Sequence, residues 1–497
     1  MTTAIQAPQT FKVPGPRPLP LIGRSLNSLR FARDSVGYTR ELFHTYGNLV
    51  ALAKGGRTRL YSPRDTCPAT VFAYGPELVR QVTTQHEVYF KYPLTGPSYR
   101  LRDRSARTRP LNHFLVGLFG VNSAEHLQQR KLMAPAFHRQ RLETYASDMV
   151  AITADQLNQL QVGRVNEMAM AMRQLTLRIA TKSLFGEDIG ASAGAAGGSP
   201  GQTIQNALNM QGKLLMRALP LDWPGLPWHR YLNLVASYEA SMRQIIQAKR
   251  QATGDEPDVL SMLMQVRDED SGDRLSEAEL LGHVGVLFVA GHETSANALT
   301  WTIFLLSQHP EIMADLLDEL EATLHGAPPS LEQLAQLPLL ENVIKESLRI
   351  LSPVPWNGRV TAQPTELGGY QLPAGTEVLV SLYQTHQMPD LYPDPAAFDP
   401  HRWETIHPDA YAYNPFSAGP RLCIGAGFAM MEIKIILAML LQRYRLEFVP
   451  QAPIDRAGVI VMRPKHGLSM AVHQQDRQFG AGVGQVRGNL REMVKLP

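Results

Sequence analysis

Cysteine is scarce in this sequence of 497 residues, which contains only Cys67 and Cys423. Two cysteines cannot form a disulfide-rich secreted scaffold, and this usage is typical of a reducing compartment. The N-terminal segment 1–23 is rich in proline and lacks the apolar core of a signal peptide. We therefore expect a cytoplasmic protein with no stable membrane anchor.

A surplus of one charge sign is also absent. The 48 lysines and arginines nearly balance 45 aspartates and glutamates, for a net charge of +3. Basic residues form no long stripe with interleaved aromatics, so we expect no nucleic-acid partner. No linker divides the chain, and we predict one domain over residues 1–497. Within it we expect a loop at 190–201 and a polar C-terminal tail at 474–497.

Apolar periodicity predicts a mainly α protein with a smaller β-sheet region, an α+β fold. Residues 123–324 show helical spacing, whereas 360–382 contain short β-type runs separated by glycine and proline. Ser276 starts a capping box, and the helix that follows meets no proline before Pro310, a length of about 50 Å. Its apolar centre contains His283, His292, Glu293 and Asn297, which are costly in a bilayer, so a buried central helix is favoured over a membrane span.

The surroundings of Cys423 give this residue a chemical role. A lone cysteine is usually a small buried apolar residue. Here two glycines flank it in the segment Phe416-Ser417-Ala418-Gly419-Pro420-Arg421-Leu422-Cys423-Ile424-Gly425, and a helix is predicted to begin just after it. Backbone N–H groups and positive potential at a helix N-terminus stabilise a thiolate, and glycines let a flat ligand approach closely.

This segment resembles the haem-binding loop of the cytochrome P-450 superfamily at every fixed position. The resemblance implies the fold of that family, a large helical domain around a long central helix. It also implies haem b, iron protoporphyrin IX, with Cys423 as the metal ligand. Phe416 and Gly425 belong to the cofactor-binding residues by the same resemblance.

Two further segments match the family in order and spacing. Glu346-Ser347-Leu348-Arg349, followed by Arg402, resembles the structural network that the family uses to hold the cysteine side of the haem together. Trp403 departs from the phenylalanine more often found after this arginine, and we interpret it as a bulkier replacement. Ala290-Gly291-His292-Glu293-Thr294-Ser295 lies in the middle of the long helix. There the family activates dioxygen, which implies that Thr294 and Glu293 are catalytic and help deliver protons.

Haem carries two propionates, and arginine pairs well with carboxylates because of its planar guanidinium. By resemblance, the candidates for this pairing are Arg421, Arg359, Arg130 and His126. His126 and Arg130 are four residues apart, which places them on one helix face. Histidine is less certain in this role than arginine, and an ordinary surface histidine is the alternative.

The reaction implied is insertion of one oxygen atom from O2 into a lipophilic substrate such as a fatty acid or a terpenoid. Electrons would come from a separate ferredoxin or flavodoxin with its NAD(P)H-linked reductase. A basic face for that partner could contain Lys131, Arg139, Arg141 and Lys434. Two alternatives remain open, a peroxide-driven or rearranging haem-thiolate enzyme and a non-catalytic haem or ligand-binding sensor.

The substrate pocket is expected to be apolar. Regions 88–120 and 205–230 would form its lid. The predicted lining residues are Val286, Val289, Ala290, Val354, Trp356 and Val459.

Overall fold

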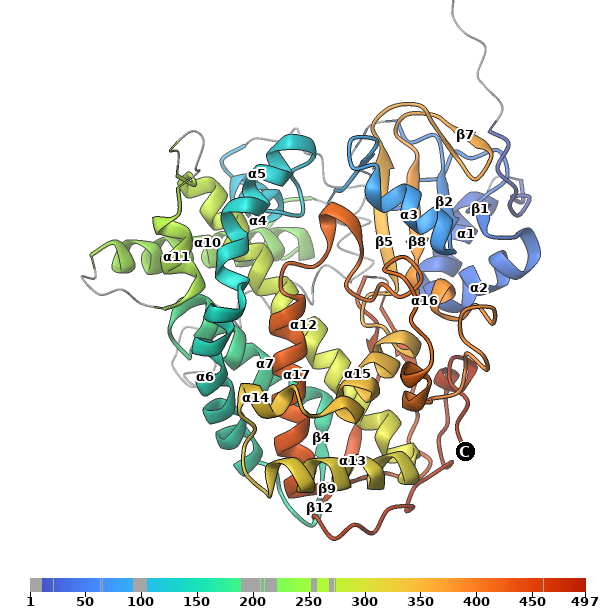
Figure 1. Cartoon of the computed structure of the whole chain (residues 1–497). Helices are drawn as coiled ribbons and strands as arrows, with labels where there is room; N and C mark the ends of the chain where they lie inside the picture. Colours follow the sequence, from blue (N-terminus) through green and yellow to red (C-terminus); the bar gives the residue numbers. More distant parts are fainter. Residues whose placement is uncertain are drawn as a thin grey trace, which may run out of the picture.

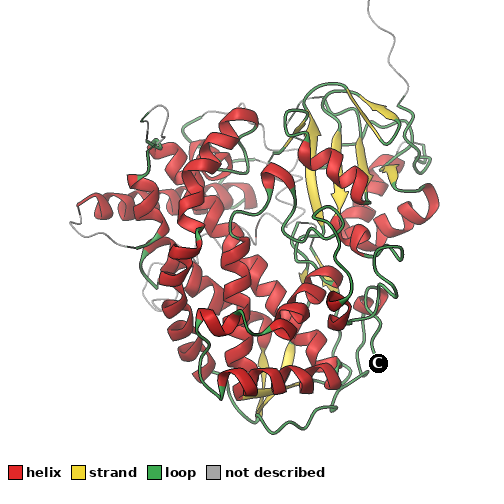
Figure 2. Ribbon diagram, viewed as in Figure 1, coloured by secondary structure: helices red, strands yellow, loops and turns green. Residues whose placement is uncertain are grey.

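A computed structural model describes residues 11–497 except 21, 63, 65, 93–104, 189–205, 207–209, 211–220, 252–256, 268–271, 273 and 459. Helices form most of the described chain, and a smaller sheet region lies to one side of them (Figures 1 and 2). The predicted fold class is confirmed. The predicted loop at 190–201 and the lining residue Val459 lie outside the described residues.

The helices begin and end as follows. The α-helices are α1 (Gly23–Arg33), α2 (Ser35–Tyr46), α3 (Pro76–Thr84), α4 (Arg109–Val116), α5 (Ser123–Met133), α6 (Arg139–Asn158), α7 (Met168–Phe185), α10 (Pro227–Gln251), α11 (Val259–Gln265), α12 (Glu277–Gln308), α13 (Pro310–Leu324), α14 (Leu331–Leu334), α15 (Pro338–Ile350), α16 (Leu382–His386) and α17 (Ala426–Arg443). The short 3-10 helices are η1 (Ala134–Phe137), η2 (Pro400–Glu404), η3 (Gly419–Arg421) and η4 (Asn489–Glu492).

The strands in the described part of the chain belong to four small sheets. The largest has the order β1-β2-β8-β5-β3, with β2 and β8 parallel and the other pairs antiparallel. Its strands are β1 (Leu49–Ala51), β2 (Thr70–Ala73), β8 (Glu377–Ser381), β5 (Trp356–Thr361) and β3 (Tyr89–Phe90). The other sheets are β4 (Arg164–Glu167), β12 (Ser469–Gln474) and β9 (Tyr444–Phe448); β6 (Thr365–Leu367) and β7 (Tyr370–Leu372); and β10 (Arg456–Ala457) and β11 (Arg463–Pro464).

Helix α12 passes through the centre of the helical body (Figure 1). Its start has the predicted capping box, in which the Ser276 hydroxyl accepts the N–H of Glu279 and the Glu279 carboxylate accepts the N–H of Ser276. Most of its residues are buried because α7, α4, α15 and α17 pack around it. A helix surrounded by other helices needs no polar face. This explains why the centre of α12 is mostly apolar, the feature for which a membrane span was considered.

The C-terminal residues differ from the prediction of a polar tail. Strand β12 extends to Gln474, and beyond it Val486, Leu490, Met493 and Val494 are each no more than 2% exposed. Polar residues separate these apolar side chains, so the amino-acid sequence of the segment is hydrophilic on average. Its apolar side chains nevertheless pack into the main hydrophobic core. Burial of this kind stabilises a segment that has little regular secondary structure.

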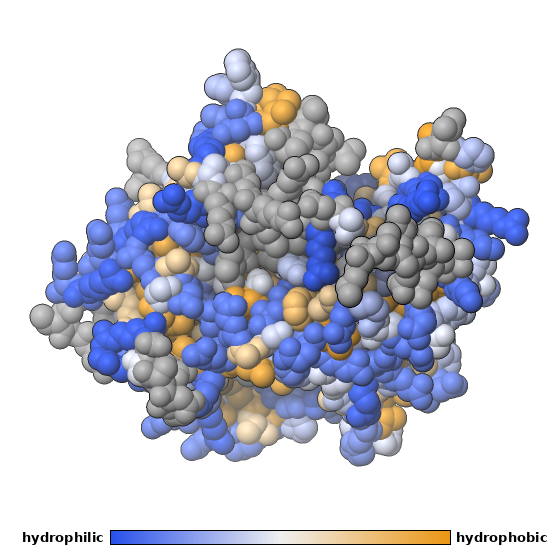
Figure 3. Space-filling view, turned by 90° about the horizontal axis from the view of Figure 1, so that it is seen from above, coloured by the Kyte–Doolittle hydropathy of each residue, from blue (hydrophilic) through white to orange (hydrophobic). Residues whose placement is uncertain are grey.

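The face seen from above is mostly hydrophilic, with scattered apolar areas on the described surface (Figure 3). No helix in the described part of the chain is long and apolar enough to cross a membrane.

Candidate active site

Cys423 lies in the turn between η3 and α17, with its side chain open to a large cavity. The Cys423 N–H donates to the carbonyl of Phe416 at 2.9 Å, which closes the loop. Gly419 has a φ of +67° and a Cβ there would meet the Thr83 carbonyl oxygen at 2.6 Å, so the loop requires glycine at this position. Burial raises the pKa of the thiol, while the Gly425 backbone N–H and the charges of Lys91 and Arg130 lower it.

The cavity has a volume of about 260 Å³ and lies between α12, α17, α5 and strand β5. Thr294 and Cys423 both reach it, from α12 and from the loop before α17. The predicted site residues that line it are Cys423, Phe416, Arg421, Gly425, His126, Arg130, Thr294, Val286, Ala290 and Val354. Its described lining is mostly apolar and contains no aspartate or glutamate.

Basic groups gather on one part of this wall. Lys91, His126, Arg130 and Arg421 line the cavity, and Arg359 lies behind them, only 2% exposed. Burial, followed by the charges of Arg359 and Arg421, lowers the pKa of Lys91 well below its ordinary value. Burial and neighbouring cations likewise lower the pKa of His126 to about 3 and that of Arg421 to about 9. Like charges concentrated at a buried site favour an anionic ligand.

Two of these basic side chains have buried nitrogen atoms without a hydrogen-bond partner, Nδ1 of His126 and Nη2 of Arg359. Unsatisfied buried donors are rare in folded proteins and indicate a missing partner. Arg421, by contrast, already donates to the carbonyls of Leu118 and Val121. The residues present therefore fit a flat apolar group that carries carboxylates, as a haem does.

The side of the cavity formed by α12 has an unusual hydrogen-bond pattern. Thr294 Oγ1 donates to the Ala290 carbonyl at 2.7 Å, and Ser295 Oγ donates to the Gly291 carbonyl at 3.4 Å. The next two carbonyls, of His292 and Glu293, accept from Thr176 Oγ1 at 3.0 Å and Asn297 Nδ2 at 2.7 Å. Four successive carbonyls thus bond to side chains, and such bonds loosen the regular pattern of a helix. A Cβ on Gly291 would meet nothing within 4 Å, so space is open beside this turn.

Among the described residues predicted to be catalytic, to bind the cofactor or to line the pocket, Glu293, Arg359, Val289 and Trp356 do not line the cavity. Glu293 is half-buried and Arg359 lies behind the wall. Val289 packs against the main hydrophobic core instead.

The Trp356 side chain points away from the cavity because successive side chains along a strand point to opposite faces. It packs against Phe31 and Phe72, with ring centroids 6.0 and 5.8 Å away, whereas its neighbour Asn357 reaches the cavity.

The structure also adds residues that the sequence did not reveal. Lys91 follows strand β3 and lies in the predicted lid region 88–120, but no motif singled it out as a member of the basic group. Asn357 donates to Ser417 Oγ at 3.0 Å, and both line the cavity. Residues two apart on a strand point to the same face. The prediction of Arg359 as a cofactor-binding residue could therefore have drawn attention to Asn357, two residues earlier.

The predicted structural network is assembled in full. Glu346 is completely buried and accepts from Arg349 Nη2 at 2.8 Å and from Arg402 Nε at 2.9 Å. Trp403 Nε1 donates to the same carboxylate at 3.1 Å.

The proposed basic face for a partner loses one member. Lys434 is buried to 9% exposure and pairs with Glu341 at 2.8 Å, because its apolar helix α17 runs through the core. Arg139 remains highly exposed. Of the predicted lid, Lys91, Leu118 and Phe119 reach the cavity, and 93–104 lie outside the described residues.

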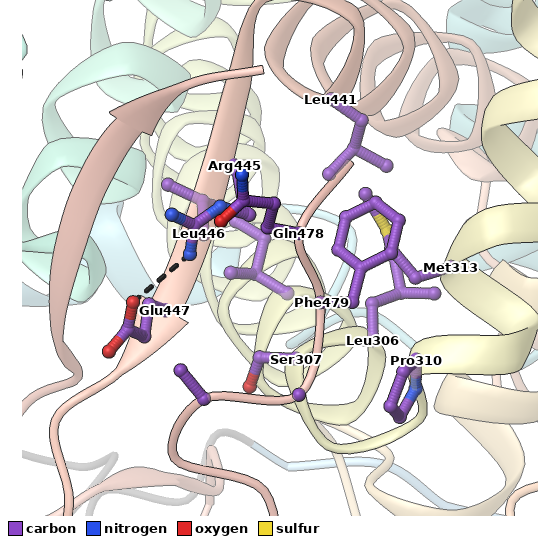
Figure 4. Close-up of a pocket in the computed structure, with 13 residues that line it drawn as sticks. Leu306, Ser307, Pro310, Met313, Leu441, Arg445, Leu446, Glu447, Gln478 and Phe479 are labelled. Atoms are coloured by element: carbon purple, nitrogen blue, oxygen red, sulfur yellow. Dashed lines mark hydrogen bonds and ion pairs between the residues drawn. The ribbon is translucent and has the colours of Figure 1, made fainter. Parts of the chain in front are cut away.

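A second, much smaller cavity of about 20 Å³ lies beside Ser307 of α12 and Arg445 of β9 (Figure 4). It has room for about one water molecule. Arg445 is already paired with Glu447 at 3.0 Å and with Asp476 at 2.6 Å, so we assign no ligand to this cavity.

Comparison with known proteins agrees with this geometry. The family model for cytochrome P450 matches residues 13–470. The chain belongs to the cytochrome P450 family. Its fold and family imply a haem cofactor with a cysteine thiolate ligand, and the protein is a monooxygenase that uses O2 and a redox partner.

Among the relatives of this cytochrome P450 is cyclooctat-9-en-7-ol 5-monooxygenase of Streptomyces melanosporofaciens. It is 32% identical over 381 residues, which cover 76% of this chain and 80% of the relative. Pentalenene oxygenase of Streptomyces avermitilis is also 32% identical, over 386 residues that cover 76% and 82%. Among solved structures, retinoic acid bound cyanobacterial CYP120A1 has a TM-score of 0.77 and 25% identity, covering 94% of this chain and all of that one.

Proposed function

We propose that this cytochrome P450 hydroxylates or epoxidises a cyclic terpenoid, with haem b held by Cys423. The observation that carries the proposal is one cavity that joins Cys423, Thr294 and an apolar wall. Apolar lining favours a lipophilic substrate. Two relatives whose names refer to terpenoid oxidation narrow the class further.

The basic residues would hold the haem propionates. His126 and Arg359 have unpartnered nitrogen atoms for this purpose, and Lys91, Arg130 and Arg421 add positive charge. Haem b carries two propionate carboxylates, and these basic groups are suited to pair with them. When bound, thiolate-ligated haem supplies the electron density that favours O–O cleavage.

The chain's own groups would control protons and water. The Thr294 hydroxyl donates to the Ala290 carbonyl, and it can still accept a hydrogen bond or turn to donate into the cavity. Glu293, half-buried on the adjacent face of α12, would pass protons inward from solvent. With haem bound above the Cys423 side chain, Phe416 and its apolar neighbours would limit the access of water to the sulfur.

Electrons would come from a ferredoxin or flavodoxin with its NAD(P)H-linked reductase. The exposed Lys131 and Arg139, with Arg141, would attract such an acidic partner. A cytoplasmic location and a single catalytic domain over 1–497 remain predictions from the sequence.

The test is a reaction of the purified haem protein with a ferredoxin, its reductase, NAD(P)H and a set of cyclic terpenes under isotopically labelled dioxygen. Thr294→Ala should still consume NAD(P)H but form about 100-fold less labelled product, as expected when a group for proton transfer is lost.

Thr300→Ala is the matched control. Thr300 also donates to the carbonyl four residues earlier at 2.7 Å, but it does not line the cavity. Product formed only with hydrogen peroxide, or equally well by Thr294→Ala, would contradict the proposal. Cys423→Ser should abolish the red-shifted Soret band of the reduced carbon monoxide complex.

A further inference from the structure

Residues 475–497, which we call the C-terminal strap, continue beyond the part of the chain that the cytochrome P450 family model matches. The strap runs along the body rather than away from it. Gly484 N donates to Gln308 Oε1 at 2.9 Å, at the end of α12. Arg456 and Arg40 both contact the Glu492 carboxylate, at 2.8 and 3.1 Å. The strap then reaches the segment that precedes η2.

That segment, residues 393–397, is held through its backbone carbonyls. Arg402 Nη1 donates to the Pro393 carbonyl at 2.8 Å, and Arg349 Nη1 donates to that of Pro395 at 2.8 Å. Arg402 and Arg349 also reach the carbonyls of Asp394 and Ala397. Of the five consecutive carbonyls, the arginines therefore contact all except that of Ala396.

The Ala396 carbonyl is contacted by the strap. The Lys495 backbone N–H donates to it at 2.8 Å, and Lys495 and Ala397 form a parallel β-bridge. Lys495 Nζ also pairs with Asp394 Oδ2 at 3.1 Å. Asp394 has a φ of +44°, a conformation that costs energy in a non-glycine residue and persists only when its surroundings hold it. Arginines on one side and the strap on the other thus fix the same five residues.

A continuous set of contacts leads from this segment to the cysteine loop. Asp399 N donates to Glu346 Oε1 at 3.1 Å, and Trp403 bonds to the same carboxylate and packs edge-on against Tyr413 at 4.5 Å.

The next residue, Asn414, donates its N–H to His386 Nε2 at 3.1 Å and accepts from Ser417 N at 2.8 Å. Phe416 then accepts from Cys423 N. Each step is a contact between packed or bonded groups, and networks of this kind can carry coupling between distant sites.

We propose that the C-terminal strap, through Lys495, is a positioning element that holds residues 393–397 against Arg349 and Arg402 and so keeps the Cys423 loop in the geometry that binds iron. The role rests on Cys423 being the iron ligand, as proposed above. No residue of the strap lines the cavity beside Cys423.

The test compares Lys495→Pro, which removes the backbone N–H and the ammonium group, with Lys495→Ala, which removes only the ammonium group. In the haem-loaded proteins, Lys495→Pro should transfer haem to excess apomyoglobin about tenfold faster, the lower end of the loss seen when an outer partner of a metal site is removed. It should also raise the fraction of the reduced carbon monoxide complex that lacks the thiolate red shift. Lys495→Ala should have a small effect.

Arg477→Ala is the matched control. Arg477 belongs to the same strap but pairs with Asp318 and Glu321 of α13, and it does not contact 393–397. It should leave haem transfer unchanged. Equal transfer rates for Lys495→Pro and Arg477→Ala would overturn the proposal.

Hydrogen exchange supplies a readout that does not depend on activity. Lys495→Pro should speed exchange in residues 413–423 as well as in 393–397, whereas faster exchange confined to 393–397 would contradict the proposal. If Lys495→Pro does not fold, a chain that ends at Val494 also removes the contacts of Lys495, together with the packing of Leu496. In the unaltered protein, Lys495 and residues 413–423 should open together, and independent opening would also overturn the proposal.

A wild-type carbon monoxide complex without the thiolate red shift would instead contradict the assignment of Cys423. The two failures are therefore distinguishable.

Discussion

The carboxylate of Glu346 shows how single residues support this haem site. A fully buried charge is costly unless other groups compensate it. Arg349 and Arg402 supply opposite charge, and Trp403 and the Asp399 N–H supply further hydrogen bonds. The sequence predicted the two arginines. It could not show why tryptophan replaces the more usual phenylalanine, because the indole N–H finds its acceptor 57 residues away.

Trp403→Phe tests the indole hydrogen bond. Loss of a bond to a buried charge should lower the free energy of unfolding by about 1.5–3 kcal/mol, measured by urea denaturation of the haem-loaded protein. Trp223, which is 71% exposed, provides the control, since Trp223→Phe should leave stability unchanged. Equal stability of Trp403→Phe and the wild type would show that the bond contributes nothing.

Among the helices, α12 and α17 determine the shape of the cavity. The capping box and the apolar run of α12, and the start of α17 just after Cys423, were predictable because they depend on neighbouring residues. Their contact was not. The contact between α12 and α17 places Glu432 of α17, which is completely buried, beside Ser295 of α12. Neither carboxylate oxygen has a hydrogen-bond partner within ordinary distance, and burial raises the Glu432 pKa to about 8 despite the opposing effect of Ser295.

Glu432→Gln should change how stability depends on pH. The native carboxyl keeps its proton up to a pKa of about 8, whereas the unfolded chain releases it near the ordinary 4.5. The native state therefore binds more protons between these values, and stability falls as pH rises through this window. Relative to Glu432→Gln, the wild type should lose up to about 5 kcal/mol, since one pH unit of separation is worth about 1.4 kcal/mol.

Urea denaturation at pH 5, 7 and 9 measures the Glu432 effect. The exposed Glu332→Gln is the control, and its difference from the wild type should not change with pH. A constant difference between Glu432→Gln and the wild type would show that Glu432 does not carry a proton in the native protein.

Across the whole molecule, chain segments distant in sequence converge on the haem site. Lys91, His126, Arg130, Arg359 and Arg421 come from β3, α5, β5 and the cysteine loop, or lie close to them, and all contribute positive charge or a ring nitrogen. No described acidic residue lines the cavity to offset them. Their mutual repulsion is compatible with a stable fold when an anionic cofactor is bound.

Removal of the haem should expose this repulsion. We expect the haem-free protein to have a lower apparent Tm and to be stabilised by sulfate, because an anion that binds only the folded state shifts the equilibrium towards it. The haem-loaded protein should respond much less. Thermal melts with and without sulfate measure the difference, and Lys91→Gln should reduce the response of the haem-free protein. Equal responses of the two forms would contradict this interpretation.

The sequence by itself determined the central helix, the cysteine loop, the position of Thr294 and Glu293 in the middle of α12 and the charged network around Glu346. Each depends on local hydrogen bonds, on helical spacing or on a short motif, which neighbouring residues specify.

Only the tertiary structure decided that Lys91 and Asn357 reach the cavity, that Trp356 turns away from it and that Lys495 holds the Ala396 carbonyl. These outcomes depend on which strand face meets the cavity and on contacts across long stretches of chain. A strand pattern fixes alternation, but packing decides which face is turned towards the site.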